Sequence, residues 1–102
     1  ISNGPFSSNT STLEVKKGKE VIALSGSEYK LFEYFMLHLG EVKSKTVLTE
    51  HIYDQDFDLD SNVIEVFVRR LRVKLDHDNH YGLIETLRGR GYRLVPLAPF
   101  QS

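Results

Sequence analysis

The sequence predicts an α+β fold in which three helices lie between two β-hairpins. Short apolar runs flank Gly-containing turns toward both ends of the chain, which is typical of hairpins. Between them, apolar residues recur at helical spacing in three segments. A serine precedes each of these segments, as expected for helix N-caps. The 102 residues fit one domain with one core.

The composition is that of an ordinary globular chain, with 40% hydrophobic and 26% charged residues and a formal net charge of −1. The absence of cysteine excludes disulfides, thiolate metal sites and cysteine nucleophiles. No apolar run approaches the roughly 18 residues of a membrane-spanning helix, and no signal-peptide pattern is present. We therefore expect a soluble, cytoplasmic domain. Because the chain begins with Ile1 rather than Met, we expect a piece of a longer protein.

Residues 1–12 are rich in Ser, Asn, Gly and Pro and show no apolar periodicity, so we expect a linker or a remnant of preceding chain there. Leu13 and Val15 then alternate with polar residues, residues 17–19 supply a turn around Gly18, and residues 21–24 form a short apolar run. This pattern predicts the first hairpin.

The first helix is predicted over residues 27–39. Ser25 and Glu28 match the capping box, in which each side chain bonds the backbone N–H of the other residue. Gly40 supplies the helix stop. The inward face is a stripe at helical spacing that consists of Leu31, Phe32, Phe35, Met36 and Leu39.

Two further helices are predicted. Ser44 caps a short helix that runs to Tyr53, and its inward residues are Val47, Leu48 and Ile52. Ser61 caps a third helix that runs to about Leu75. Its buried stripe follows spacings of four, three and four residues and consists of Ile64, Val68, Leu71 and Leu75.

A second hairpin is predicted at the end of the chain. Residues 84–87 and 92–95 are short strand-like runs that flank Arg88, Gly89, Arg90 and Gly91. The two glycines permit positive φ angles at the turn. The tip of this hairpin is therefore basic.

All arginines of the chain lie within the third helix and this hairpin, at positions 69, 70, 72, 88, 90 and 93. The near-neutral net charge conceals this asymmetry, because residues 1–58 carry a net −3 and residues 59–102 a net +2. Arginine suits fork-like recognition of phosphate and of guanine edges. The alternative is an ordinary solvated helix face.

Val66 and Val73 fall nearly opposite the buried stripe of the third helix, beside Arg69 and Arg70. β-branched apolar residues among arginines suit a face that enters the DNA major groove, where a valine can contact a thymine methyl group. The alternative is that both valines pack against the N-terminal hairpin.

Three motifs occur in this order: Leu24-Ser25-x-x-Glu28 before an apolar helix, the run from Ser61 to Arg72, and the run Thr86-Leu87-Arg88-Gly89-Arg90-Gly91-Tyr92-Arg93. Together they resemble the winged-helix DNA-binding domain of OmpR/PhoB-type response regulators. The resemblance implies a winged helix-turn-helix over residues 13–98, with a four-stranded N-terminal antiparallel sheet, three helices and a C-terminal β-hairpin wing. Residues 99–102 would be a tail.

The resemblance also implies the DNA contacts. The third helix would enter the major groove, with Arg70 as its principal base reader, and the wing would reach the minor groove through Arg88. Base contacts are implied for Asn62, Val63, Val66, Arg70 and Arg88. Phosphate contacts are implied for Lys45, Thr46, Arg69, Arg72, Lys74 and Arg90. Many relatives carry His where this chain has Phe67, which cannot donate a hydrogen bond.

Several partners follow from the same resemblance. They are double-stranded DNA in direct repeats, a second copy on that DNA, RNA polymerase, a receiver domain of the same protein and its sensor histidine kinase. The segment matching the family's polymerase-contact loop comprises Asp54, Gln55, Asp56, Phe57 and Asp58. No cofactor and no metal is implied.

Other classes of function remain as alternatives. The oxygen-bearing residues from Asp54 to Glu65 match an EF-hand calcium loop, except that Leu59 stands where the turn requires Gly. His77, His80 and Asp78 lie in a polar loop, and no hydrolase, zinc-protease or P-loop motif occurs, so we do not expect an enzyme. A purely protein-binding module is the remaining alternative, which salt-dependent binding to duplex DNA would exclude.

Overall fold

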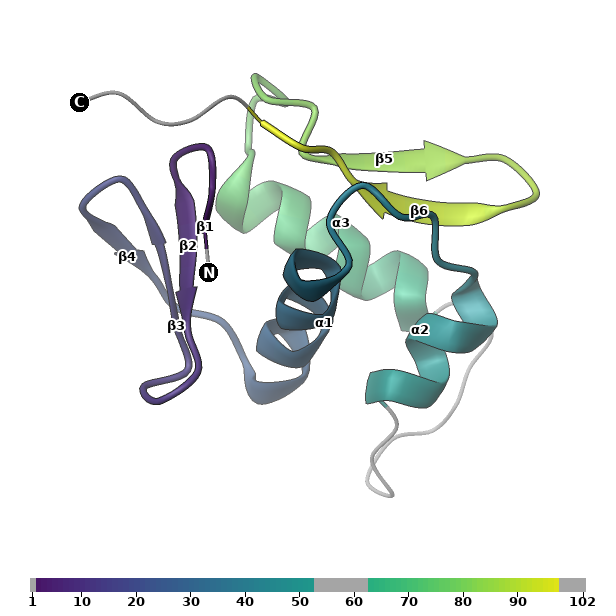
Figure 1. The fold of residues 1–102 in the computed structure, drawn as a ribbon, viewed down its shortest axis with the longest axis horizontal. Coiled ribbons are helices and arrows are strands. Elements are labelled where there is room, and N and C mark those ends of the chain that lie inside the picture. The colour runs from purple at the N-terminus through teal and green to yellow at the C-terminus, as the bar shows by residue number, and fades with distance from the viewer. Residues whose placement is uncertain (1, 53–62, 98–102) are drawn as a thin grey trace.

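The computed structural model describes residues 2–52 and 63–97 (Figure 1). A four-stranded antiparallel sheet lies at one side of the molecule, and its strands are Ser2–Asn3 (β1), Phe6–Asn9 (β2), Glu14–Lys17 (β3) and Glu20–Ile22 (β4). The helices are Gly26–Leu37 (α1), Lys45–Ile52 (α2) and Val63–Leu75 (α3). The chain then forms the hairpin Ile84–Leu87 (β5) and Gly91–Leu94 (β6), which we call the wing. This arrangement confirms the predicted fold class, and no described helix has the length and apolar character to cross a membrane.

The linker predicted for residues 1–12 is wrong where the structure has strands β1 and β2. Phe6 is fully buried, and its ring meets that of Tyr81 edge-on at 5.4 Å between centroids. Asn3 is also buried, and its side chain donates to the carbonyl of Val95 and accepts from the N–H of Leu97. The strand pattern escaped detection because inward positions alternate with outward ones but only Phe6 is a large apolar residue.

The first predicted hairpin is confirmed as β3 and β4, with Val15 paired to Ile22 across the turn at Gly18. Leu13 differs from the prediction. Its φ is +56° and its side chain is 57% exposed, so it belongs to the turn before β3 rather than to the strand.

The capping box of α1 is confirmed. The Glu28 N–H donates to the Ser25 hydroxyl at 3.2 Å, and the Ser25 N–H donates to Glu28 Oε1 at 2.8 Å. The helix ends at Leu37, two residues before the predicted end, because His38 leaves the helical conformation. Leu39 consequently lies outside the buried stripe and is exposed.

The second and third helices follow their predicted stripes with two differences. Leu48 and Ile52 are buried, but Val47 is exposed on the first turn of α2, so its predicted inward position is wrong. The stripe of α3 is confirmed, and Phe67 joins it at 5% exposure. The predicted cap Ser61 and the predicted helix end Tyr53 lie outside the described residues.

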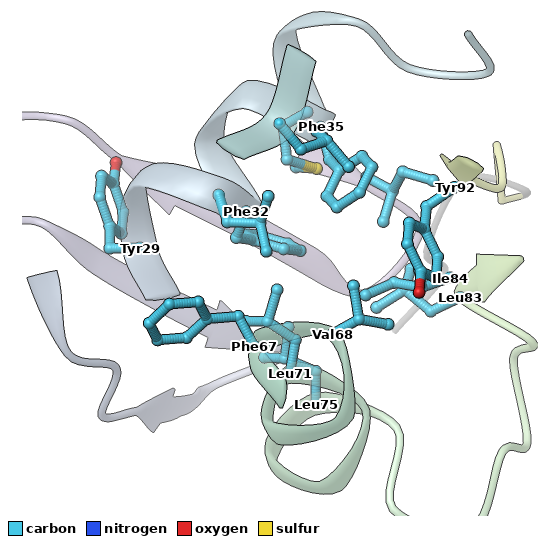
Figure 2. Close-up of a cluster of buried hydrophobic side chains, with 14 of the residues drawn as sticks. Tyr29, Phe32, Phe35, Phe67, Val68, Leu71, Leu75, Leu83, Ile84 and Tyr92 are labelled. Atoms are coloured by element: carbon cyan, nitrogen blue, oxygen red, sulfur yellow. The ribbon is translucent and has the colours of Figure 1, made fainter. Parts of the chain in front are cut away.

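The core fixes α3 relative to α1 and the wing. Figure 2 shows Phe67, Val68 and Leu71 turned from α3 toward α1, where Phe32 and Phe35 lie, with Tyr92 of the wing at the far end of the cluster. Each of these side chains stabilises the fold by about 1.5–3 kcal/mol through burial. One face of α3 is therefore buried in the core, and the opposite face is exposed and can bind a partner.

Candidate nucleic-acid interface

The outward face of α3 combines valines with arginines. Val66 is 43% exposed and Val73 is 55% exposed, and Arg69 and Arg70 are exposed beside them. The alternative in which both valines pack against the N-terminal hairpin is therefore wrong. A mixed apolar and cationic helix face can contact thymine methyl groups and donate to base edges.

Phe67 holds Arg70 on one flank of this face. The guanidinium carbon of Arg70 lies 5.6 Å from the centroid of the Phe67 ring, within the range of a cation–π contact. Because Phe67 is buried at the same time, it supports Arg70 from the core side. Phe67 therefore has a packing role that an outward-facing phosphate contact would not have.

The wing presents its arginines at a tight turn. Arg88 and Arg90 are exposed, and the N–H of Arg90 donates to the carbonyl of Leu87 at 2.9 Å. Gly89 has a φ of +75°, a conformation that side-chain-bearing residues adopt at a cost. The turn thus directs two cations away from the body of the domain.

Gly91 fastens the wing to the segment between α1 and α2. Lys43 and Tyr92 exchange two backbone hydrogen bonds, 2.8 and 2.9 Å long. A Cβ atom on Gly91 would lie 2.0 Å from the carbonyl oxygen of Lys43. Only glycine therefore permits this close approach of the two backbones.

Arg72 fastens the wing to α3. Its Nη2 atom donates to the carbonyl of Ile84 and to the hydroxyl of Thr86, each at 2.7 Å. Its Nε atom also donates to Ile84, at 3.3 Å. The wing and α3 thereby keep a fixed relative position, which a two-groove contact with DNA requires.

A groove of about 690 Å³ lies between α3, the start of α2 and the wing. Of the residues that the structure describes, five basic side chains and a single carboxylate, that of Glu65, line it. The basic residues are Lys45, Arg69, Arg72, Arg88 and Arg90. The groove is thus strongly cationic, as expected of a site for a polyanion.

Glu65 of α3 forms an ion pair with Lys45 of α2 across this groove. Hydrogen bonding to Glu65 raises the pKa of the Lys45 ammonium. Thr46 follows Lys45 and is exposed in the first turn of α2, where backbone N–H groups favour anions. Lys45 and Thr46 therefore lie where a phosphate could reach them.

Lys74, a predicted phosphate contact, is not among the residues that line this groove. It donates to Glu28 Oε1 at 2.7 Å, and this ion pair links the last turn of α3 to the start of α1. Burial raises the pKa of Glu28, but hydrogen bonds from Lys74 and Ser25 outweigh it and lower the pKa below its usual 4.5. The charge of Lys74 thus already has a partner within the domain.

Of the remaining predicted site residues, one packs against the core and the others lie outside the residues that the structure describes. Val63 is half-buried against the core. The predicted base contact Asn62, the polymerase-contact loop from Asp54 to Asp58 and most of the EF-hand frame lie outside the described residues. Within residues 2–52 and 63–97, no three His, Cys, Asp or Glu side chains gather closely enough to hold a metal ion.

Sequence reasoning missed Glu65 and Lys43 as residues of the interface. Glu65 stands four residues before Arg69 and so shares its flank of α3, a signal that could have identified it. Lys43 carried no such signal, because its contribution is a backbone bridge to the wing.

Comparisons with known proteins agree on one family. The family described as "Transcriptional regulatory protein, C terminal" matches residues 18–94. The transcriptional regulatory protein CusR of Escherichia coli is 44% identical over 73 residues, which are 72% of this chain and 32% of CusR. The chain thus spans about a third of the length of this curated relative.

Solved structures give the same result. The DNA-binding domain of CpxR from Escherichia coli superimposes with a TM-score of 0.82 at 27% identity and covers 96% of this chain and 97% of that one. The DNA-binding domain of RstA from Klebsiella pneumoniae, solved in complex with the RstA box, gives a TM-score of 0.81 at 28% identity, with 94% and 96% coverage.

Proposed function

The chain belongs to the OmpR/PhoB-type winged-helix domains of response regulators, which are DNA-binding transcription-factor domains and not enzymes, and we propose that it binds duplex DNA through α3 and the wing. The observation that carries this proposal is the exposed face of α3, where valines stand among arginines beside a wing tipped with two more arginines. A helix of this kind fits the major groove, which is wide enough to admit it.

Base reading falls to α3 in this proposal. Arg70 reads a guanine edge, and Val66 contacts a thymine methyl group beside it. The cation–π contact with Phe67 supports this role, because it limits the orientations of the Arg70 side chain before DNA arrives. Asn62 and Val63 are proposed as neighbouring base contacts at the start of the helix.

Minor-groove reading falls to Arg88 of the wing. A narrow A·T-rich minor groove has an enhanced negative potential that attracts an inserted arginine. The anchoring of the wing by Arg72 and by the Lys43–Tyr92 bridge supports this role, because it fixes how far the tip stands from α3.

The proposed phosphate contacts differ in how free their charges are. Arg69 and Arg90 are exposed in the groove and form no ion pair with a described carboxylate, whereas the exposed ammonium of Lys45 is paired with Glu65. Thr46 is exposed next to Lys45 and offers a hydroxyl group. Arg72 holds the wing with Nε and Nη2 and retains Nη1 for a phosphate. We infer that Lys74 acts through the fold instead, because it is paired with the buried carboxylate of Glu28, whereas the pair of Lys45 with Glu65 is half exposed on both sides.

The wider partners belong to the whole protein. We infer that a receiver domain of the same protein, phosphorylated by a sensor histidine kinase, controls the domain, and that two copies bind direct repeats in the bacterial cytoplasm. We also propose that residues 54–58 contact RNA polymerase.

Selection from random duplex DNA tests the proposal directly. We expect one enriched motif, and the logarithm of the affinity should fall linearly with the logarithm of the salt concentration. Enrichment of no motif, together with affinity that salt leaves unchanged, would refute DNA binding and favour a protein-binding module.

A further inference from the structure

Among the described residues that line the cationic groove, Glu65 is the one carboxylate. A carboxylate in a site for phosphates costs affinity through repulsion, so its presence calls for a function. Its ion pair with Lys45 leaves both side chains about half exposed, and such pairs add little stability. The ion pair is therefore a weak reason for its position.

Glu65 lies in the first turn of α3. In helix-turn-helix domains the recognition helix presents its N-terminal residues to base edges. Glu65 shares its flank with Arg69, four residues on, which lines the same groove. The carboxylate therefore lines the groove and also lies at the end of α3 that contacts DNA bases in the proposed function.

Lys45 holds this carboxylate from the neighbouring helix. The ion pair uses Oε1 of Glu65, and no donor among the described residues bonds Oε2, so that oxygen can accept from a second donor. An ionised carboxylate accepts hydrogen bonds only, so a base that satisfies it must offer an N–H group. The cytosine N4 amino group does so in the major groove, whereas adenine places the N7 acceptor beside its N6 amino group.

We infer that Glu65 is a further base-reading residue whose carboxylate, positioned by Lys45, accepts a hydrogen bond from a cytosine amino group in the major groove. This inference rests on the proposed DNA binding by α3. The ammonium of Lys45 also offsets the charge of Glu65 next to the phosphates, so the carboxylate selects a base with less loss of backbone affinity.

Parallel selections from random duplex DNA test the inference with four forms of the 102-residue chain: wild type, Glu65→Ala, Glu65→Gln and Glu20→Ala. Glu20 is an exposed carboxylate on β4 in the N-terminal sheet, and its replacement changes the net charge as Glu65→Ala does. Thermal melts monitor folding, and the exposure of the Glu65–Lys45 pair predicts near-wild-type stability for all four forms.

The wild type should prefer cytosine at one position of the motif by about tenfold. Glu65→Ala should lose that preference and keep all others, and Glu20→Ala should match the wild type. Glu65→Gln should shift the preference toward adenine, which glutamine can bind through N6 and N7. A merely structural role for Glu65 would not produce this change of base.

Two outcomes would overturn the inference while leaving DNA binding intact. In one, Glu65→Ala enriches the wild-type motif with every preference unchanged. In the other, it binds all duplexes more tightly by the same factor, which would make Glu65 a source of repulsion only. If the wild type enriches no motif at all, the proposed function fails and the inference fails with it.

Discussion

Replacing Gly91 with alanine should loosen the wing. The new Cβ would lie 2.0 Å from the Lys43 carbonyl oxygen and 2.8 Å from the Cα of Ser44, both backbone atoms that cannot rotate away. The two hydrogen bonds between Lys43 and Tyr92 must therefore break or stretch, at about 0.5–1.5 kcal/mol each. The φ of +132° adds about 1–3 kcal/mol of backbone strain for alanine.

These contributions amount to about 2–6 kcal/mol, a large share of the 5–15 kcal/mol by which domains are stable. Urea denaturation followed by circular dichroism would measure the loss. Gly89→Ala is the matched control, because its φ of +75° is also positive but nothing lies within 4 Å of its Cβ. We expect that control to cost only about 1–2 kcal/mol, the cost of a left-handed conformation for a residue with a Cβ atom. Equal free energies of unfolding for the two variants would refute the argument from close approach.

Three other predictions concern DNA and pH. Arg70→Ala should cost about 1–3 kcal/mol on the selected site and flatten one base preference, and equal weakening on every sequence in a titration would make Arg70 a phosphate contact. Arg88→Ala should weaken binding more on sites with A·T-rich flanks than on sites with G·C-rich flanks, and equal losses in the same titration would contradict minor-groove reading. The lowered pKa of Glu28 contributes stability above pH 4.5 that is lost as pH falls through the folded-state pKa. Glu28→Gln should therefore reduce the decrease of unfolding free energy between pH 6 and pH 3, as measured by urea titrations. If the variant lost as much unfolding free energy over this range as the wild type, other groups would be the cause of the acid sensitivity.

The helices were predictable because their signals are local. A capping box needs only Ser25 and Glu28, and the α3 stripe repeats at the helical period. Both signals can therefore be recognised in the sequence without knowledge of the tertiary fold. Strands β1 and β2 were missed because their partners are distant: Asn3 bonds residues 95 and 97, and only Phe6 shows the inward face. A polar segment that pairs with residues far away in the sequence has almost no sequence pattern by which it could be predicted.

The site was predictable as a set of residue types but not as a set of roles. The arginine cluster and the valines opposite the buried stripe could be read from the helix period. Sequence alone could not distinguish cations by their partners. Arg72 bonds the wing and Lys74 bonds buried Glu28, and both contacts join residues that are at least 12 positions apart.

The gathering of basic side chains in the groove, away from the acidic N-terminal part, explains how a chain with a net charge of −1 can present a site for a polyanion. Surface charges more than about 8–10 Å away are screened at physiological salt, so a phosphate responds to the groove and not to the acidic N-terminal part. Within the groove, Arg69, Arg88 and Arg90 form no ion pair with a described carboxylate, whereas Lys45 is paired with Glu65. Few free cations imply few released counterions and hence a shallow salt slope, about 0.9 per phosphate contacted. Base contacts from α3 must then supply a larger share of the affinity than in strongly basic domains. This is why the outward face of α3, and not the total charge, is the part of the molecule in which substitutions should most alter DNA recognition.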